Sequence, residues 1–166
     1  MELVAAMIAD AAVVERGKLY IHGGGWDTIF AATFPAVHPS MAVALLLRVE
    51  YAEALKDIPI TIELVDEDGH PVGVKIEGKV NVGHAPGTKP GQPIFVPQSI
   101  TLNGLQLPKE GSYNFRISSG SRHLGSIVFR VVPAAAMPPG ILPPGMLPPG
   151  SSPPGMLPPG GQPPTK

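Results

Sequence analysis

The sequence predicts an all-β protein: an antiparallel β-sandwich of about eight to nine strands with immunoglobulin-like Greek-key connections, followed by a disordered proline-rich tail. Three observations support this class. Apolar residues alternate with polar ones over short runs, as at Tyr113, Phe115 and Ile117, which is the period of a half-buried strand. Turns marked by Gly or Pro recur at short intervals, and only residues 51–57 have the composition of a short helix. The composition then changes abruptly at Pro133. A closed barrel would fit the same strand pattern.

Length and composition place one β-sandwich domain in residues 1–132 and the tail in residues 133–166. A domain of this size can bury a core without metals or disulfides. The absence of cysteine excludes disulfides, zinc–thiolate sites and thiol nucleophiles. With 12 Lys and Arg against 13 Asp and Glu, the chain lacks the basic excess that binding to a nucleic-acid backbone needs. We therefore expect no nucleic-acid partner.

The apolar N-terminal run is predicted to be a strand and not a signal peptide or a membrane anchor. No Lys or Arg precedes the run, Glu2 opens it, and Asp10 breaks it. No apolar run approaches the roughly 20 residues that a membrane-spanning helix needs. The expected location is the cytoplasm, with no membrane partner.

The first part of the chain alternates short apolar runs with turn signals. The predicted strands are residues 3–9, 19–22, 26–30 and 41–50. Asp10 is expected to end the first strand, and residues 15–18 to form a turn. The glycines at 23–25 permit a sharp bend between the second and third strands. Residues 33–39 contain two prolines, which predicts a crossover loop and excludes a helix or a central strand.

The second part of the chain continues the alternation with clearer hairpins. The predicted strands are residues 60–65, 72–82, 94–102, a run entered at Tyr113, and 124–132. Asp66 to Gly69 and the Ser-Gly-Ser link at 119–121 predict two hairpin turns. Residues 83–93 have no periodicity and are predicted to form a long exposed loop. Gly111 lies two residues before Tyr113, the setting of a tyrosine corner, in which the hydroxyl bonds the backbone of the preceding connection.

The tail of residues 133–166 has a composition unlike that of the domain. It holds thirteen of the 22 prolines, and Pro-Pro-Gly units recur in it at a period of five. Collagen requires Gly at every third position, so the repeat is not collagen-like. We expect a disordered, locally extended tether in which Pro-Pro pairs favour polyproline II.

No catalytic, cofactor-binding or metal-binding residue is predicted. The glycines at 23–25 are followed by a strand pattern and not by a helix with a Lys-Ser/Thr pair, so they predict a turn and not a phosphate loop. Asp66, Asp68 and Gly69 lack the closing Glu of a calcium loop and predict a hairpin turn. The five histidines are scattered singly, with no His-x-x-x-His pair. No Gly-x-Ser-x-Gly elbow occurs.

These observations predict a non-enzymatic protein-interaction or scaffolding module, whose protein partner binds the tail or an edge strand. The alternative is a small-ligand or carbohydrate-binding sandwich that uses loop residues. Trp26, His38 and His84, the last in the 83–93 loop, are the candidate ligand or partner surface. A third hypothesis is a hydrolase whose site is assembled in space. The sequence leaves the oligomeric state open.

Several short stretches, in their order along the chain, resemble a known family. The residues that carry the resemblance are 5–12, 17–19, 23–27, 34–39, 102–105, Pro108 and 111–113. The chain is similar here to an uncharacterised family of small bacterial proteins, a domain of unknown function, over residues 3 to about 131. The resemblance implies a bacterial, cytoplasmic β-sandwich. It implies no activity and no catalytic residues.

Overall fold

The computed structural model describes residues 1–136, so the predicted tail lies outside the described residues from position 137 onward. Residues 1–136 form one compact unit. The strands are β1 (Glu2–Glu15), β2 (Lys18–Gly24), β3 (Thr28–Ala31), β4 (Ala36–Val49), β5 (Ile58–Asp66), β6 (Pro71–Val80), β7 (Ile94–Leu107), β8 (Gly111–Ser119) and β9 (Arg122–Pro133). Two short 3-10 helices, η1 (Tyr51–Glu53) and η2 (Ala134–Ala136), complete the described elements. Neither has the length or the apolar character that crossing a bilayer requires.

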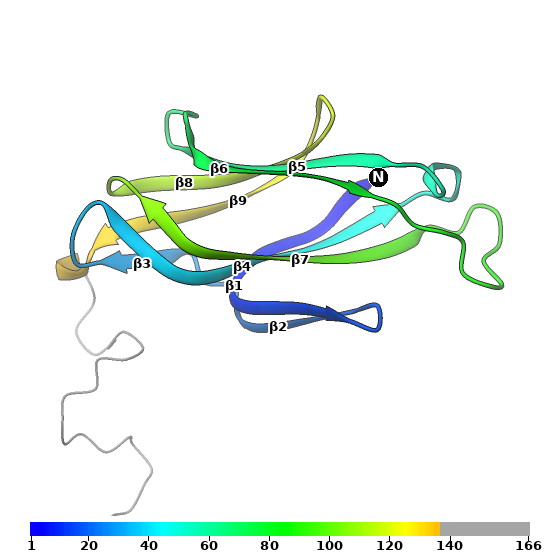
Figure 1. The fold of residues 1–166 in the computed structure, drawn as a ribbon, viewed down its shortest axis with the longest axis horizontal. Helices are drawn as coiled ribbons and strands as arrows, with labels where there is room; N and C mark the ends of the chain where they lie inside the picture. Colours follow the sequence, from blue (N-terminus) through cyan, green and yellow to red (C-terminus); the bar gives the residue numbers. More distant parts are fainter. Residues whose placement is uncertain (137–166) are drawn as a thin grey trace, which may run out of the picture. The chain divides into compact units, whose positions relative to one another are not determined.

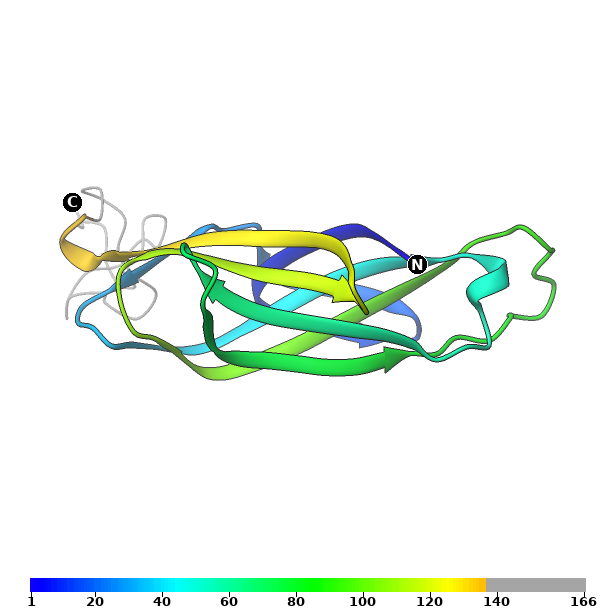
Figure 2. The same cartoon turned by 90° about the horizontal axis from the view of Figure 1, so that it is seen from above.

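The strands form two sheets, shown in Figures 1 and 2. Sheet A has the order β2-β1-β4-β7, and sheet B has the order β3-β9-β8-β5-β6. All neighbouring strands run antiparallel except β3, which runs parallel to β9. The predicted all-β fold of mostly antiparallel strands is therefore confirmed, with one parallel pair that the sequence pattern did not predict.

The core lies between the sheets and is built from the alternation seen in the sequence. Met41, Val43 and Leu45 on β4 are fully buried, as are Phe115 and Phe129 on β8 and β9. The two phenylalanine rings stack with centroids 5.6 Å apart. Burying each such side chain contributes about 1.5–3 kcal/mol before entropy is counted. The prediction that one face of β4 and of β8 points inward is confirmed.

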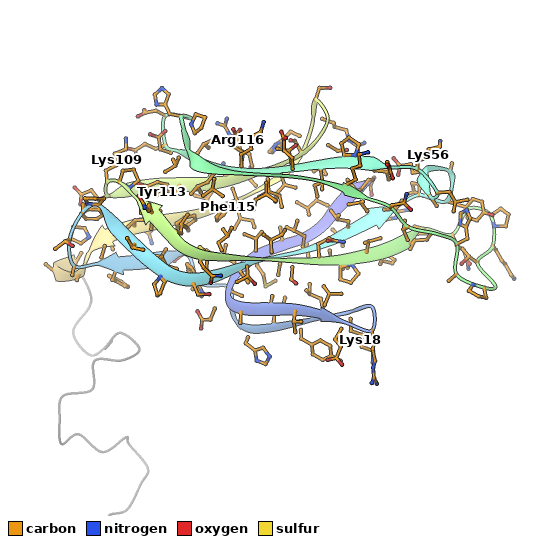
Figure 3. The ribbon with its side chains drawn as sticks, viewed as in Figure 1. Lys18, Lys56, Lys109, Tyr113, Phe115 and Arg116 are labelled. Atoms are coloured by element: carbon orange, nitrogen blue, oxygen red, sulfur yellow. The ribbon has the colours of Figure 1, made fainter. Side chains whose placement is uncertain are left out.

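Tyr113 forms the predicted tyrosine corner at the start of β8. Its ring is only 1% exposed. Its hydroxyl donates to the carbonyl oxygen of Lys109 at 2.7 Å and accepts from the Lys109 backbone N–H at 3.3 Å. Figure 3 shows Tyr113 and Phe115 between the sheets and Arg116 on the outer side of sheet B. The corner fixes the connection from β7 to β8, which crosses from one sheet to the other.

The expectation that Asp10 ends the first strand is wrong, because β1 continues to Glu15. β1 pairs with β4 as far as Ala9 and with β2 from Ala9 onward. Asp10 is exposed in the extension, where a charged side chain keeps its hydration. A charge therefore marks the point where β1 changes its partner, and not the end of the strand.

The β1–β2 hairpin lies against the outer face of sheet A. β2 contacts β7 although β1 and β4 separate them in the sheet order, and Figure 1 shows β2 below β4 and β7. Ala42 and Ala44 point away from the core, yet they are 0% and 2% exposed. Their small side chains allow close approach of the hairpin. Part of the outer face of sheet A is thus covered by the chain itself.

The predicted crossover loop at residues 33–39 is corrected in its second half, because β4 begins at Ala36 and includes Pro39. β1 pairs with β4 only between Ala42 and Arg48. At Pro39, β4 has β7 as its one strand neighbour in the described chain and is locally an edge. A residue without an N–H is tolerated there.

β7 extends to Leu107 and not only to the predicted 102. Ile100 and Leu102 pack against the core before Gly104, whereas Leu105 and Leu107 are buried after it. The inward-facing positions therefore change from even to odd at Gly104, which has a φ of +64°. The change of face interrupts the alternation of apolar and polar residues without ending the strand. A prediction based on that alternation therefore ends the strand too early.

Candidate functional site

Trp26 and His38, two of the residues singled out in the sequence, lie together beside the start of β4. Their ring centroids are 5.8 Å apart with the ring planes tilted by 53°. The Trp26 Nε1–H donates to Oδ1 of Asp10 at 3.1 Å. Trp26 comes from the link between β2 and β3, and Asp10 comes from the β1 extension. The sequence pattern singles out Trp26 and His38 but not Asp10, which it marks only as the end of a strand.

The glycines at 23–25 make this cluster possible. Gly23 has a φ of +60°, and a Cβ on it would lie 2.0 Å from Oδ2 of Asp10. Only glycine therefore lets the turn pass under the Asp10 carboxylate. The backbone N–H of Gly25 donates to the carbonyl oxygen of Ile8 at 3.0 Å. The predicted sharp bend is confirmed, and it leads β2 of sheet A into β3 of sheet B.

His38 is the titratable group of the cluster. Partial burial lowers its pKa below the ordinary value of 6.5, while a hydrogen bond to the Ser40 backbone and the nearby Asp10 charge act in the opposite direction. The imidazole is therefore neutral at pH 7. It borders a shallow groove of about 390 Å³ that is otherwise lined by residues 29–33, 35–37, Pro39 and Leu107; Trp26 and Asp10 lie beside His38 but do not line the groove. An indole, a neutral imidazole and a carboxylate together can stack on and hydrogen-bond an uncharged polar ring.

His84 does not join this cluster. Its ring stacks on Tyr51 with centroids 3.9 Å apart, beyond the far end of β4. From His38 to Val49, β4 spans roughly 36 Å at about 3.3 Å per residue. Figure 2 shows the loop after β6 and strand β3 at opposite ends of the two sheets. The Nδ1 atom of His84 is buried without a hydrogen-bond partner in the described residues. The three predicted residues thus belong to two separate places.

Asp66, Asp68 and His70 present side-chain atoms within 4.8 Å of one another at the β5–β6 turn. Oδ1 of Asp66 accepts the backbone N–H groups of Asp68 and His70 at 3.1 and 2.9 Å, as in a hairpin turn. Nζ of Lys109 lies 3.3 Å from Asp66 and 3.7 Å from Asp68. The His70 N–H and then Lys109 lower the pKa of Asp66. The Asp66 carboxylate therefore already stabilises the turn, and the carboxylates of Asp66 and Asp68 both lie beside the Lys109 ammonium group.

β7 is the long open edge of sheet A, and sequence reasoning did not single it out. Its 14 residues include no charged side chain. A groove of about 380 Å³ runs between residues 72–74 of β6 and residues 101–106 of β7. The β6 edge carries Lys75, Glu77 and Lys79, which discourage pairing. The uncharged run from 94 to 107 was the available sequence signal, but ending the strand at 102 hid its length.

Fold and surface together define a small β-sandwich domain in which, over residues 1–136, the fully buried side chains are apolar apart from the hydroxyl of Tyr113. Its polar groups and grooves lie at strand edges and turns. The chain belongs to DUF6941, a family of unknown function whose model matches residues 4–132. The predicted resemblance to an uncharacterised family over residues 3 to about 131 is thereby confirmed. No curated protein matches the chain.

Proposed function

We propose that the protein is a non-enzymatic interaction module that binds protein partners at the free edge of β7. One observation carries the proposal: a 14-residue edge strand without a single charge borders an open groove. Soluble proteins normally protect such edges with charges, prolines or a covering segment, whereas β7 has no charge, and its one proline, Pro97, leaves residues 98–107 without one. Unpaired backbone groups recruit an added strand, and an adjacent groove receives its side chains.

The strand order supports an immunoglobulin-like Greek key with one position vacant. In the letters used for immunoglobulin domains, β9-β8-β5-β6 follows the order G-F-C-C′, and β1-β4-β7 follows A-B-E. Strand D, which would pair with E, has no counterpart in residues 1–136. The free edge of β7 is where strand D would lie. The tyrosine corner at the start of β8, the counterpart of strand F, fits the same scheme.

The non-enzymatic part of the proposal is supported by the burial pattern. Within the described chain, every titratable side chain is at least partly exposed except Tyr113, whose hydroxyl is already bonded to the Lys109 backbone. The proline-rich repeats from 137 onward lie outside the described residues, and they are proposed on sequence alone as a second partner-binding element. A bacterial cytoplasm as the place of action is proposed on the resemblance alone.

The proposal is tested by comparing the partners captured by the full chain and by a Thr101→Lys variant. Thr101 is exposed on β7, so the lysine adds a charge to the edge without entering the core. Tyr20→Lys on β2, the opposite edge of sheet A, is the matched control. We expect Thr101→Lys to lose a stoichiometric partner that the control retains. Identical partners for all three proteins would overturn the proposal.

A second candidate function is recognition of a small uncharged ligand. It is favoured by the contact between Trp26 and His38 beside the groove that His38 lines. A thermal-shift and indole-fluorescence screen with neutral sugars tests it. We expect a ligand to change Trp26 emission and to raise Tm, and His38→Ala to abolish both effects. A ligand that raises Tm equally in His38→Ala would place binding elsewhere.

A further inference from the structure

We infer that the partner of β7 is a second copy of this chain, with the two β7 strands paired antiparallel about a twofold axis that lies within residues 98–103. The inference rests on the proposed function and names the partner for the same edge. Such pairing would join the two copies of sheet A into one sheet of eight strands.

The pairing segment is bounded by two residues that interrupt a strand edge. Pro97 has no N–H to donate, and Gly104 has a φ of +64°. The six residues between them, Gln-Ser-Ile-Thr-Leu-Asn, are uncharged and include β-branched Ile100 and Thr101. Within the described residues β7 pairs only with β4, so the backbone groups on the other side of this segment have no strand partner.

The approach to this edge is open. The groove between β6 and β7 borders residues 101–106, and Thr101 and Asn103 are exposed. Phe95, on the same strand, is 55% exposed although it is a large apolar residue. An added strand would therefore meet unpaired backbone along residues 98–103 and cover apolar surface beside it. Both contributions favour association.

A second copy fits this edge because antiparallel pairing about a twofold axis is self-complementary. Each backbone donor meets the acceptor of the same segment in the other copy. Side chains of that segment also face one another, so any charge within it would lie near its own copy and repel it. Residues 98–103 contain none. A second copy is, moreover, present wherever the chain itself is present.

The other edges of the described sheets are less suited to this pairing. β6 carries Lys75, Glu77 and Lys79, and Gly73 interrupts it with a φ of +75°. β3 has four residues. β2 has seven and ends in two glycines. Length, lack of charge and extended backbone therefore coincide at β7.

The test is the mass of the full chain in solution, measured by sedimentation across a wide concentration range. We expect a species of twice 17.3 kDa that dissociates on dilution. Thr101→Lys and Thr101→Glu should each weaken association about tenfold through like-charge repulsion. An equimolar mixture of the two variants should restore a dimer of one copy of each. Tyr20→Lys, on the opposite edge, should dimerise as the wild type does.

Folding of each variant is checked by circular dichroism and Tm, and Ser99→Lys replaces any variant that fails to fold. A wild type that stays at 17.3 kDa throughout would overturn the inference. So would a dimer as strong in the two Thr101 variants as in the wild type, or a mixture of variants that stays monomeric. If the wild type is monomeric but Thr101→Lys still loses a captured partner, the interaction function stands and only the identity of the partner is wrong.

Discussion

Replacing Tyr113 with Phe isolates the energy of the corner that ties β7 to β8. The substitution keeps the buried ring and its stacking on Phe129, at a centroid distance of 5.7 Å, and removes only the hydroxyl. The lost bonds are the 2.7 Å donation to the Lys109 carbonyl and the weaker 3.3 Å bond from the Lys109 N–H. Each ordinary hydrogen bond contributes about 1 kcal/mol net, so we expect a loss of about 1–2 kcal/mol.

Urea denaturation followed by circular dichroism measures this loss. The midpoint should fall while the m value stays constant, because the same surface is exposed on unfolding. A loss of this size corresponds to a Tm decrease of roughly 3–7 °C for a domain of this length. Tyr20→Phe, at a side chain that is 45% exposed, is the control and should change stability by less than about 0.5 kcal/mol. Equal effects of the two substitutions would refute a buried corner.

Three further predictions concern the turns and the titratable groups. Gly23→Ala should lower the free energy of unfolding by about 1–2 kcal/mol or more, because the added Cβ would clash with Asp10. Gly25→Ala is the control, since its added Cβ meets no atom and only its φ of +87° is unfavourable. Equal decreases for the two variants in urea denaturation would contradict the prediction. Burial lowers the pKa of His38 in the folded state, so the unfolded chain binds a proton more readily and the stability of the domain should fall as the pH drops below 6.5. In measurements of Tm against pH, a His38→Gln variant should lack this decrease. The pKa of Asp66 is lowered in the folded state, so protonation of its carboxylate below pH 3.8 destabilises the domain. Asp66→Asn should therefore reduce the decrease in Tm as the pH falls below 3.8. An unchanged decrease would show that the turn does not depend on the charge of Asp66.

The two candidate surfaces would act independently. The Trp26–His38 cluster lies at the start of β4 and combines Trp26, from the link between β2 and β3, with His38 of β4 and Asp10 of β1. The pairing segment of β7 lies along the edge of sheet A. A small ligand at the first surface and a protein at the second would not compete for residues. The thermal-shift screen and the sedimentation test can therefore be read separately.

Local patterns predicted the turns and most strands correctly because both depend on neighbours in the sequence. The Asp66 to Gly69 turn is held by its own side chain and backbone, and Tyr113 bonds a residue only four positions away. Alternation likewise predicted which side of β4 is buried. It could not show that Pro39 lies within a strand, because that depends on the absence of a second strand beside it. Nor could it show that the inward face changes at Gly104, because that depends on the backbone conformation of Gly104.

The candidate site required the tertiary structure. Asp10 and Trp26 are 16 residues apart, and only the turn at Gly23 brings them within hydrogen-bond distance. His38 and His84 look equivalent in the sequence, yet the length of β4 separates them.

By itself, the sequence determined the strand periodicity, the hairpin turns and the tyrosine corner of this protein, since these follow from side-chain polarity and backbone preference over a few residues. The tertiary structure decided which strands share a sheet, where β1 changes partner, and which edge is left unpaired. Those properties arise from contacts between distant segments, and an edge is defined by the absence of a neighbour, which no local pattern records.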